Sequence, residues 1–114
     1  MFDTHEFHQI NEFIDHLNTA NNETELKSAC ETVITGDYIE TSDGFEALAS
    51  LVYIKNHYDN DDFELSQELK DLALDAANQL MRDDENGLYD YMNEHGELDS
   101  YLDYLDDIIE NILE

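Results

Sequence analysis

Acidic side chains recur at helical spacing in two segments of this sequence. The steps between the acids in the first segment, about residues 63–82, are four, three and four, so these acids share one narrow helix face. Those in the second, about residues 97–114, fall within about 100° of helical arc. Neither face contains Lys or Arg. We call them the first stripe (Glu64, Glu68, Asp71, Asp75) and the second stripe (Asp99, Asp103, Asp106, Asp107, Glu110, Glu114).

The spacing of the second stripe resembles that of phosphates in DNA. A helix rises about 1.5 Å per residue, so residues 97–114 span about 27 Å. Counting Glu97, that length holds one acid per roughly 4 Å, against about 3.4 Å per phosphate along one DNA strand. The stripes also forgo the few tenths of a kcal/mol that each Glu–Lys pair at i,i+4 would add. They predict a surface on which carboxylates stand in for phosphates, while the simpler interpretation is that the acids serve solubility.

The composition narrows the class of protein. The 114 residues contain 30 acids against Lys27, Lys55, Lys70 and Arg82, which gives a net charge of -26 and a pI of about 4.1. Such a charge repels nucleic acid and anionic membranes, so we expect no direct binding to either. Cys30 has no partner for a disulfide, no apolar run is long enough to span a membrane, and the first residues lack a signal-peptide pattern. We therefore expect a soluble, cytoplasmic protein.

The apolar residues that must position these acids are periodic. They make up 41% of the chain, which has no proline and only four glycines, a combination that favours helices joined by short turns. We expect one domain over residues 1–114 and an all-α fold, a compact bundle of five or six helices with a highly acidic surface. The expected helices cover about 4–17, 22–35, 43 onward, 63–82, 88–95 and 97–113, with a short extended piece at 38–41.

Polar residues and glycines predict where these helices begin and end. Thr4, Asn22 with Glu25, Asp43 with Glu46, and the acidic run 59–62 are the expected amino-terminal caps, and Gly36 and Gly96 the expected stops. The last helix also carries an apolar seam with steps of four and three, typical of packed helices. This seam consists of Leu98, Leu102, Leu105, Ile109 and Ile112.

Other chemistry finds little support in the sequence. His5, His8, Glu12 and His16 share one side of the first helix but lack the spacing of a metalloprotease helix, and the acidic turns fail the EF-hand pattern. Cys30 lies on an apolar face, which suits a buried side chain more than a nucleophile. There is no glycine-rich phosphate loop, nucleophile elbow or Cys pair. We expect no metal site, no cofactor and no enzymatic activity.

The chain resembles the small Ocr-type antirestriction proteins of bacteriophages. The resemblance covers most of the chain and rests on its size, its acidic helical composition and the order of three segments: TELKSA at 24–29, FEALAS at 45–50 and YLDYLDDIIE at 101–110. It implies a dimeric surface, shaped like bent DNA, that occupies the DNA channel of type I restriction–modification enzymes and related defence methyltransferases. The chain departs from that pattern at its end, which is apolar where Ocr-type proteins have an acidic tail.

The sequence thus predicts a DNA mimic that inhibits a basic DNA-handling protein of the host, with the ten residues of the stripes as its contacts. Two alternatives remain open. One is an acidic interaction module, a regulator or chaperone of a basic protein that does not imitate DNA. The other is a structural dimerisation domain that uses the apolar seam of the last helix.

Overall fold

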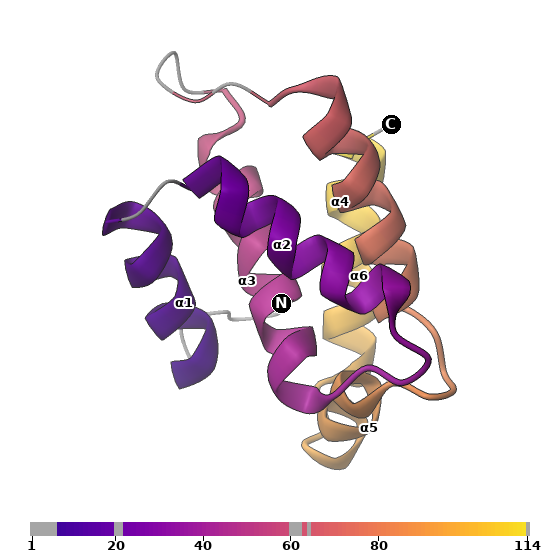
Figure 1. Cartoon of the computed structure of the whole chain (residues 1–114). Coiled ribbons are helices and arrows are strands. Elements are labelled where there is room, and N and C mark those ends of the chain that lie inside the picture. Colours follow the sequence, from indigo (N-terminus) through magenta and orange to yellow (C-terminus); the bar gives the residue numbers. More distant parts are fainter. Residues whose placement is uncertain (1–6, 20–21, 60–62, 64, 114) are drawn as a thin grey trace.

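The computed structural model describes residues 7–19, 22–59, 63 and 65–113, and within them the fold is all-helical. Six α-helices follow one another and the last continues into a π-helical turn (Figure 1). The described residues form no strand, only one isolated β-bridge. The elements are α1 (His8–Thr19), α2 (Asn22–Thr35), α3 (Thr41–His57), α4 (Gln67–Leu80), α5 (Gly87–Glu94), α6 (Leu98–Ile108) and η2 (Ile109–Leu113).

Helix α3 forms the centre of the molecule. Ten of its 17 residues are buried, and they lie on all sides of the helix rather than on one stripe. A helix that is apolar all round requires neighbours all round, and α3 packs against α1, α2, α4 and α5. Figure 1 shows it running behind α2, between α1 on one side and α4 and α6 on the other.

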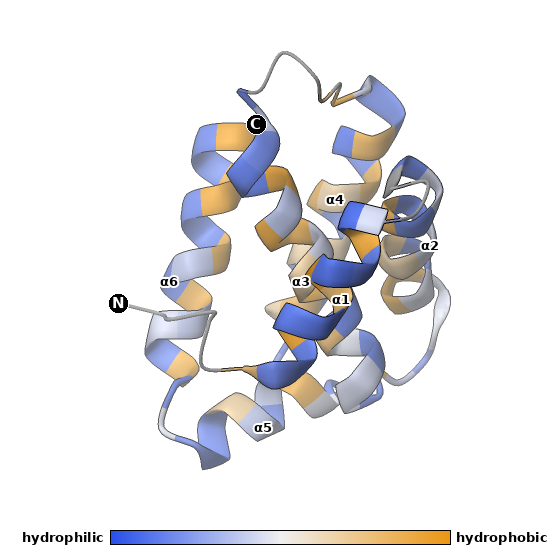
Figure 2. Ribbon diagram, turned by 90° about the vertical axis from the view of Figure 1, so that its left-hand side faces the viewer, coloured by the Kyte–Doolittle hydropathy of each residue, from blue (hydrophilic) through white to orange (hydrophobic). Residues whose placement is uncertain are grey.

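The surrounding helices each turn one apolar face inward. Ile10 and Leu17 of α1, Leu26 of α2, and Leu69 and Leu80 of α4 are fully buried, while the opposite faces are hydrophilic, as the banding in Figure 2 shows. None of the described Asp and Glu side chains is buried. The core is therefore apolar and leaves the charge of the protein outside, where water and salt screen its self-repulsion.

The helix limits test the predicted caps. The predicted stops at Gly36 and at Gly96, whose φ is +71°, are confirmed for α2 and α5. Helix α2 spans Asn22–Thr35, so Asn22, the predicted cap, is instead its first helical residue. Two predicted starts are wrong. Helix α3 begins at Thr41 instead of Asp43, and α4 begins at Gln67, where the Ser66 side chain accepts a hydrogen bond from the Leu69 amide. Thr4 and residues 60–62 lie outside the described residues.

The segment predicted as extended, 38–41, joins two distant parts of the chain. Ile39 pairs with the α4–α5 connection in the β-bridge to Asn86: its amide donates to the Glu85 carbonyl at 2.8 Å, and its carbonyl accepts from the Gly87 amide at 2.7 Å. A Cβ on Gly87 would lie 2.9 Å from the Ile39 carbonyl oxygen, so this approach requires glycine.

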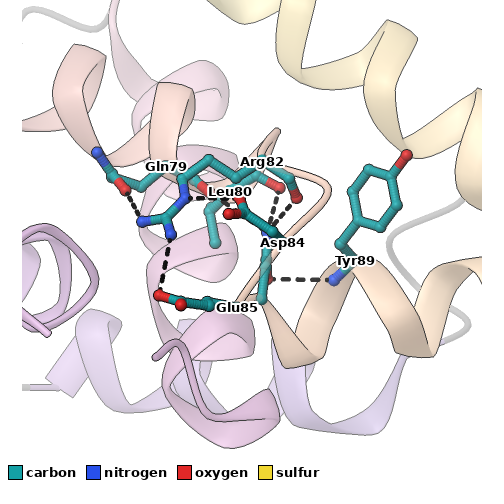
Figure 3. Close-up of polar contacts among 7 residues, drawn as sticks. Gln79, Leu80, Arg82, Asp84, Glu85 and Tyr89 are labelled. Carbon is teal, nitrogen blue, oxygen red and sulfur yellow. Dashed lines mark hydrogen bonds and ion pairs between the residues drawn. The ribbon is translucent and has the colours of Figure 1, made fainter. Parts of the chain in front are cut away.

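The Asn86 side chain holds the α4–α5 connection together, in the region that Figure 3 shows. Its amide nitrogen donates to the carbonyls of Leu80 at 2.8 Å, Arg82 at 3.1 Å and Gln79 at 3.3 Å. Its oxygen accepts from the amides of Leu88 and Tyr89 and so caps α5. Asn86 is 2% exposed, so water cannot replace these bonds.

Arg82 supports the same connection from outside. Its guanidinium donates to Gln79 Oε1 at 2.7 Å, and lies 3.5 Å from carboxylate oxygens of both Asp84 and Glu85 (Figure 3). The neighbouring Glu85 has a φ of 52°, which lies in the left-handed region of backbone conformation that residues other than Gly, Asn and Asp seldom adopt.

Asn86→Ala should lower the free energy of unfolding by about 2–4 kcal/mol, since it removes a helix cap and leaves buried backbone groups without partners. Urea denaturation followed by circular dichroism measures this loss. Asn93→Ala is the matched control on the exposed side of α5 and should change stability by less than about 0.5 kcal/mol. Equal losses in the two variants would contradict the role given to Asn86.

Candidate partner-binding surface

The structure places the described residues of both stripes on the surface. Glu68, Asp71 and Asp75 of the first stripe are all exposed on α4. The second stripe contributes five exposed acids from α6 and η2, namely Asp99, Asp103, Asp106, Asp107 and Glu110. Glu64 and Glu114 lie outside the described residues.

The faces opposite the stripes anchor both helices in the core. Leu69, Ala73, Ala76, Ala77 and Leu80 of α4 are buried, and so are Tyr101, Leu105 and Ile108 of α6. The acids of each helix cannot turn inward without pulling these residues into water. The stripes are therefore held in fixed rows by the packing of the helices that carry them.

Helices α4 and α6 are also tied to each other. The Tyr101 hydroxyl of α6 donates a 2.6 Å hydrogen bond to the carbonyl of Leu80 at the end of α4, and Tyr101 is fully buried. Helix α4 packs against η2 as well. Figure 1 shows α4 in front of α6, and the turned view of Figure 2 shows the two helices apart. The two stripe helices are therefore joined through the Tyr101 hydrogen bond and the packing of α4 on η2.

Lysines from other helices reach both stripes, which corrects the expectation of purely one-signed faces. Lys27 Nζ of α2 lies 3.4 Å from Glu68 Oε2, and Lys55 Nζ of α3 lies 4.0 Å from Asp107 Oδ2. Lys55 also sits 4.4 Å from the centre of the Tyr104 ring. Helical spacing within α4 and α6 could not show these cations, because they come from neighbouring helices.

These ion pairs leave the stripes largely uncompensated. The side chains of Glu68 and Asp107 remain 71% and 56% exposed, and pairs between exposed groups contribute only about 0–1 kcal/mol. Six of the eight described stripe acids have no Lys or Arg partner among the ion pairs of the described residues. The two surface lysines therefore reduce the negative charge at the edges of the stripes and do not cancel it.

The histidines considered as metal ligands face different carboxylates. His8 Nε2 lies 2.9 Å from Glu12 on α1, whereas His16 Nε2 lies 3.4 Å from Glu25 on α2. Within the described part of the chain, no three His, Cys, Asp or Glu side chains are grouped as metal ligands. His5 lies outside that part.

The apolar seam of the last helix is mostly used inside the chain. Leu105, Ile109 and Ile112 are buried, and Leu98 and Leu102 are half-buried. A substitution such as Ile109→Asp would thus damage the core as well as any dimer. The break into η2 at Ile109 replaces the single helix expected over 97–113.

Two adjacent hollows lie outside the stripes, between α1, α2 and α3. They have volumes of about 350 and 270 Å³, and Phe13, His16 and Glu46 line both. Glu25 lines the larger hollow and Glu12 the smaller. We call the two together the α1–α3 groove. Helical spacing does not predict this groove. It assigns Glu46 to a helix cap and His16 to one side of the first helix, and the residues that they meet in the groove come from other helices.

The charge around the groove affects Glu46. Partial burial and the nearby carboxylates of Asp43 and Glu25 raise the pKa of its carboxyl above the usual 4.5, and His16 acts in the opposite direction. Glu46 is therefore repelled by its neighbours when ionised.

Comparison with known proteins adds no identification. The chain matches no protein-family model, no curated protein and no solved structure. The likeness to Ocr-type proteins stays a prediction based on residues 24–29, 45–50 and 101–110.

No helix in the described residues combines the length and the apolar character needed to cross a membrane.

Glu46→Gln should raise the free energy of unfolding at pH 7 by about a few tenths of a kcal/mol, because it removes a repelled charge from an exposed site. A raised folded-state pKa means that the native Glu46 is stabilised by protonation. The extra free energy of unfolding of the variant should thus shrink as the pH falls and vanish below 4.5, the ordinary pKa of a glutamate. Urea titrations at several pH values measure it, with Glu31→Gln as an equal-charge control. A loss of stability at pH 7 would contradict this reasoning.

Cys30 should be unreactive in the native protein. It is fully buried, and burial together with the charge of Glu31 raises the pKa of its thiol to about 12. Labelling with a thiol reagent at pH 8 should be at least about a hundredfold slower than in urea. A Ser28→Cys/Cys30→Ala chain, with its thiol at an exposed position of the same helix, should label rapidly. Equally fast labelling of native wild type would refute the burial.

Proposed function

We propose that this protein is a DNA mimic that inhibits a host DNA-handling protein by occupying its basic DNA-binding cleft. The observation that carries the proposal is the exposure of all eight described stripe acids on two helices whose other faces are buried. A partner cleft lined with Lys and Arg meets rows of carboxylates at a spacing close to that of phosphates. Glu64 and Glu114 complete the proposed contact set.

Rigidity supports the same proposal. A decoy competes with DNA best when its charges are already in position, since ordering flexible side chains and loops costs affinity. The Tyr101–Leu80 hydrogen bond and the packing of α4 on η2 hold the two stripe helices together before any partner binds. The net charge of -26 adds long-range attraction toward a basic cleft, which speeds association at low salt.

The favoured target follows from the resemblance to Ocr-type proteins. It is a type I restriction–modification enzyme or a related defence methyltransferase, and blocking it would counter host defence against a phage or mobile element. The site of action is then the host cytoplasm. A homodimer is part of this proposal, since the family's surface is dimeric. The mimic needs no cofactor and catalyses no reaction.

A second candidate function is an acidic interaction module for a basic protein, without imitation of DNA. The α1–α3 groove favours it, because Glu12, Glu25 and Glu46 gather there away from both stripes. The two functions differ in one outcome: a mimic displaces DNA from its partner, and an interaction module leaves DNA bound.

The stripes should be required for displacement of DNA. In a competition assay with a purified type I restriction–modification enzyme and fluorescent duplex DNA, wild type should release the DNA. The variant Asp99→Asn/Asp103→Asn/Asp106→Asn/Glu110→Gln should need about tenfold more protein, a loss of about 1.4 kcal/mol in binding. Raising the salt from about 50 to 300 mM should weaken the binding of the wild-type protein to the enzyme, because salt screens the attraction between their charges.

The control variant Glu31→Gln/Asp37→Asn/Asp90→Asn/Glu94→Gln removes the same charge from exposed positions outside the stripes. It should shift the competition curve by less than about twofold, since its acids lie off the proposed contact rows. Equal shifts in the two variants would mean that total charge and not the rows matters, and would refute mimicry. Wild type that binds the enzyme while DNA stays bound would favour the interaction module.

A further inference from the structure

The α1–α3 groove differs from the stripes in shape and in composition. It is concave, and its larger hollow of about 350 Å³ falls within the range of about 300–1,000 Å³ typical of ligand pockets. Its residues come from three helices: Phe13 and His16 from α1, Glu25 from α2 and Glu46 from α3. None of the stripe residues lines it.

The groove combines an aromatic wall with carboxylates. Phe13 lines both hollows, with its ring centre 5.8 Å from that of His16, and Phe45 lines the smaller hollow. Glu12, Glu25 and Glu46 stand around these rings, and no Lys or Arg is among the described residues that line the groove. An aromatic face beside carboxylates attracts a flat cation, which can stack on the ring while it donates hydrogen bonds to the acids.

The charges of the groove are only partly balanced within the chain. His16 approaches Glu25 at 3.4 Å, and His8 approaches Glu12 at 2.9 Å. Glu46 lines the larger hollow together with Glu25, and partial burial with the charges of Asp43 on its own helix and of Glu25 raises its pKa. A cation that is charged at every physiological pH would relieve this repulsion more completely than a histidine.

We propose that the α1–α3 groove receives the guanidinium of an arginine side chain from a protein partner. Guanidinium fits better than ammonium because it is planar, binds carboxylates in a bidentate manner and stacks on aromatic rings. An arginine within a polypeptide fits better than free arginine, because the residues around it can pack on the surface next to the groove. The groove thus acts as an anchoring pocket, since arginine is one of the residues that dominate interface energies.

This anchoring pocket does not depend on the proposed mimicry of DNA. A basic partner could insert an arginine here if the protein is a DNA mimic that binds it through the stripes. It could equally do so if the protein is an interaction module. The test below uses short peptides in place of the DNA-binding target, so its result stands whether or not the competition assay supports mimicry.

Nuclear magnetic resonance of the ¹⁵N-labelled full chain tests the pocket with acetyl-Gly-Arg-Gly-amide at about 150 mM salt. The amide signals of four groove residues should shift as peptide is added, and the shifts should reach a plateau at high peptide concentration: Phe13, His16, Glu25 and Glu46. The matching lysine peptide and free arginine should each bind at least about threefold more weakly, and the neutral citrulline peptide should give no saturating shift. Shifts spread evenly over all acidic helices, or equal binding of the citrulline peptide, would overturn the proposal.

Three variants identify the residues responsible. Glu25→Gln/Glu46→Gln should weaken the arginine peptide at least about fivefold, while Asp103→Asn/Asp106→Asn, which removes the same charge from the second stripe, should change it less than twofold. Ser28 lines the larger hollow from an exposed position. Ser28→Lys therefore places an ammonium there, which should pair with the carboxylates of the groove and prevent the arginine peptide from binding. The dispersion of each spectrum reports that the variant is folded. Unchanged binding in the Glu25/Glu46 variant would refute the assignment.

Discussion

Residues 47–54 of helix α3 are buried on all sides, and the other helices are arranged to cover them. The ten buried residues of α3 can leave water only if α1, α2, α4 and α5 cover them, and each of those helices does so with its own apolar face. The acids then have one place left, the outer surface. The hydrophobic burial of α3 thus opposes the mutual repulsion of a chain with a net charge of -26.

The same arrangement determines what the charge can do. Acids that recur at helical spacing share one face only when the helix beneath them is fixed. The buried faces of α4 and α6 fix it as far as Ile108, and η2 changes the helical spacing before Glu110. The Tyr101–Leu80 hydrogen bond and the Asn86 network hold the segments that connect these helices. The proposed contact with a basic cleft therefore depends on apolar packing and buried hydrogen bonds as much as on carboxylates.

The surface of the protein offers two different kinds of acidic site. The stripes are rows of exposed acids on α4, α6 and η2, and the partner proposed for them normally follows the backbone of DNA. The α1–α3 groove is concave and contains aromatic rings, and it suits a single flat cation. Both sites are proposed to bind basic proteins, and only the stripes are proposed to compete with DNA, so the two sites can be tested separately.

Spacing within single helices is enough to predict the helical class, the end of α2 at Gly36 and the exposure of the described stripe acids. Packing between helices, by contrast, determines that α3 is central, that Ser66 and not the run 59–62 caps α4, and that Asn86 joins two connections. It also determines that Lys27 and Lys55 reach the stripes and that Glu25 meets Glu46 in a groove. These contacts join residues far apart in the chain, and helical periodicity carries no information about which helices become neighbours.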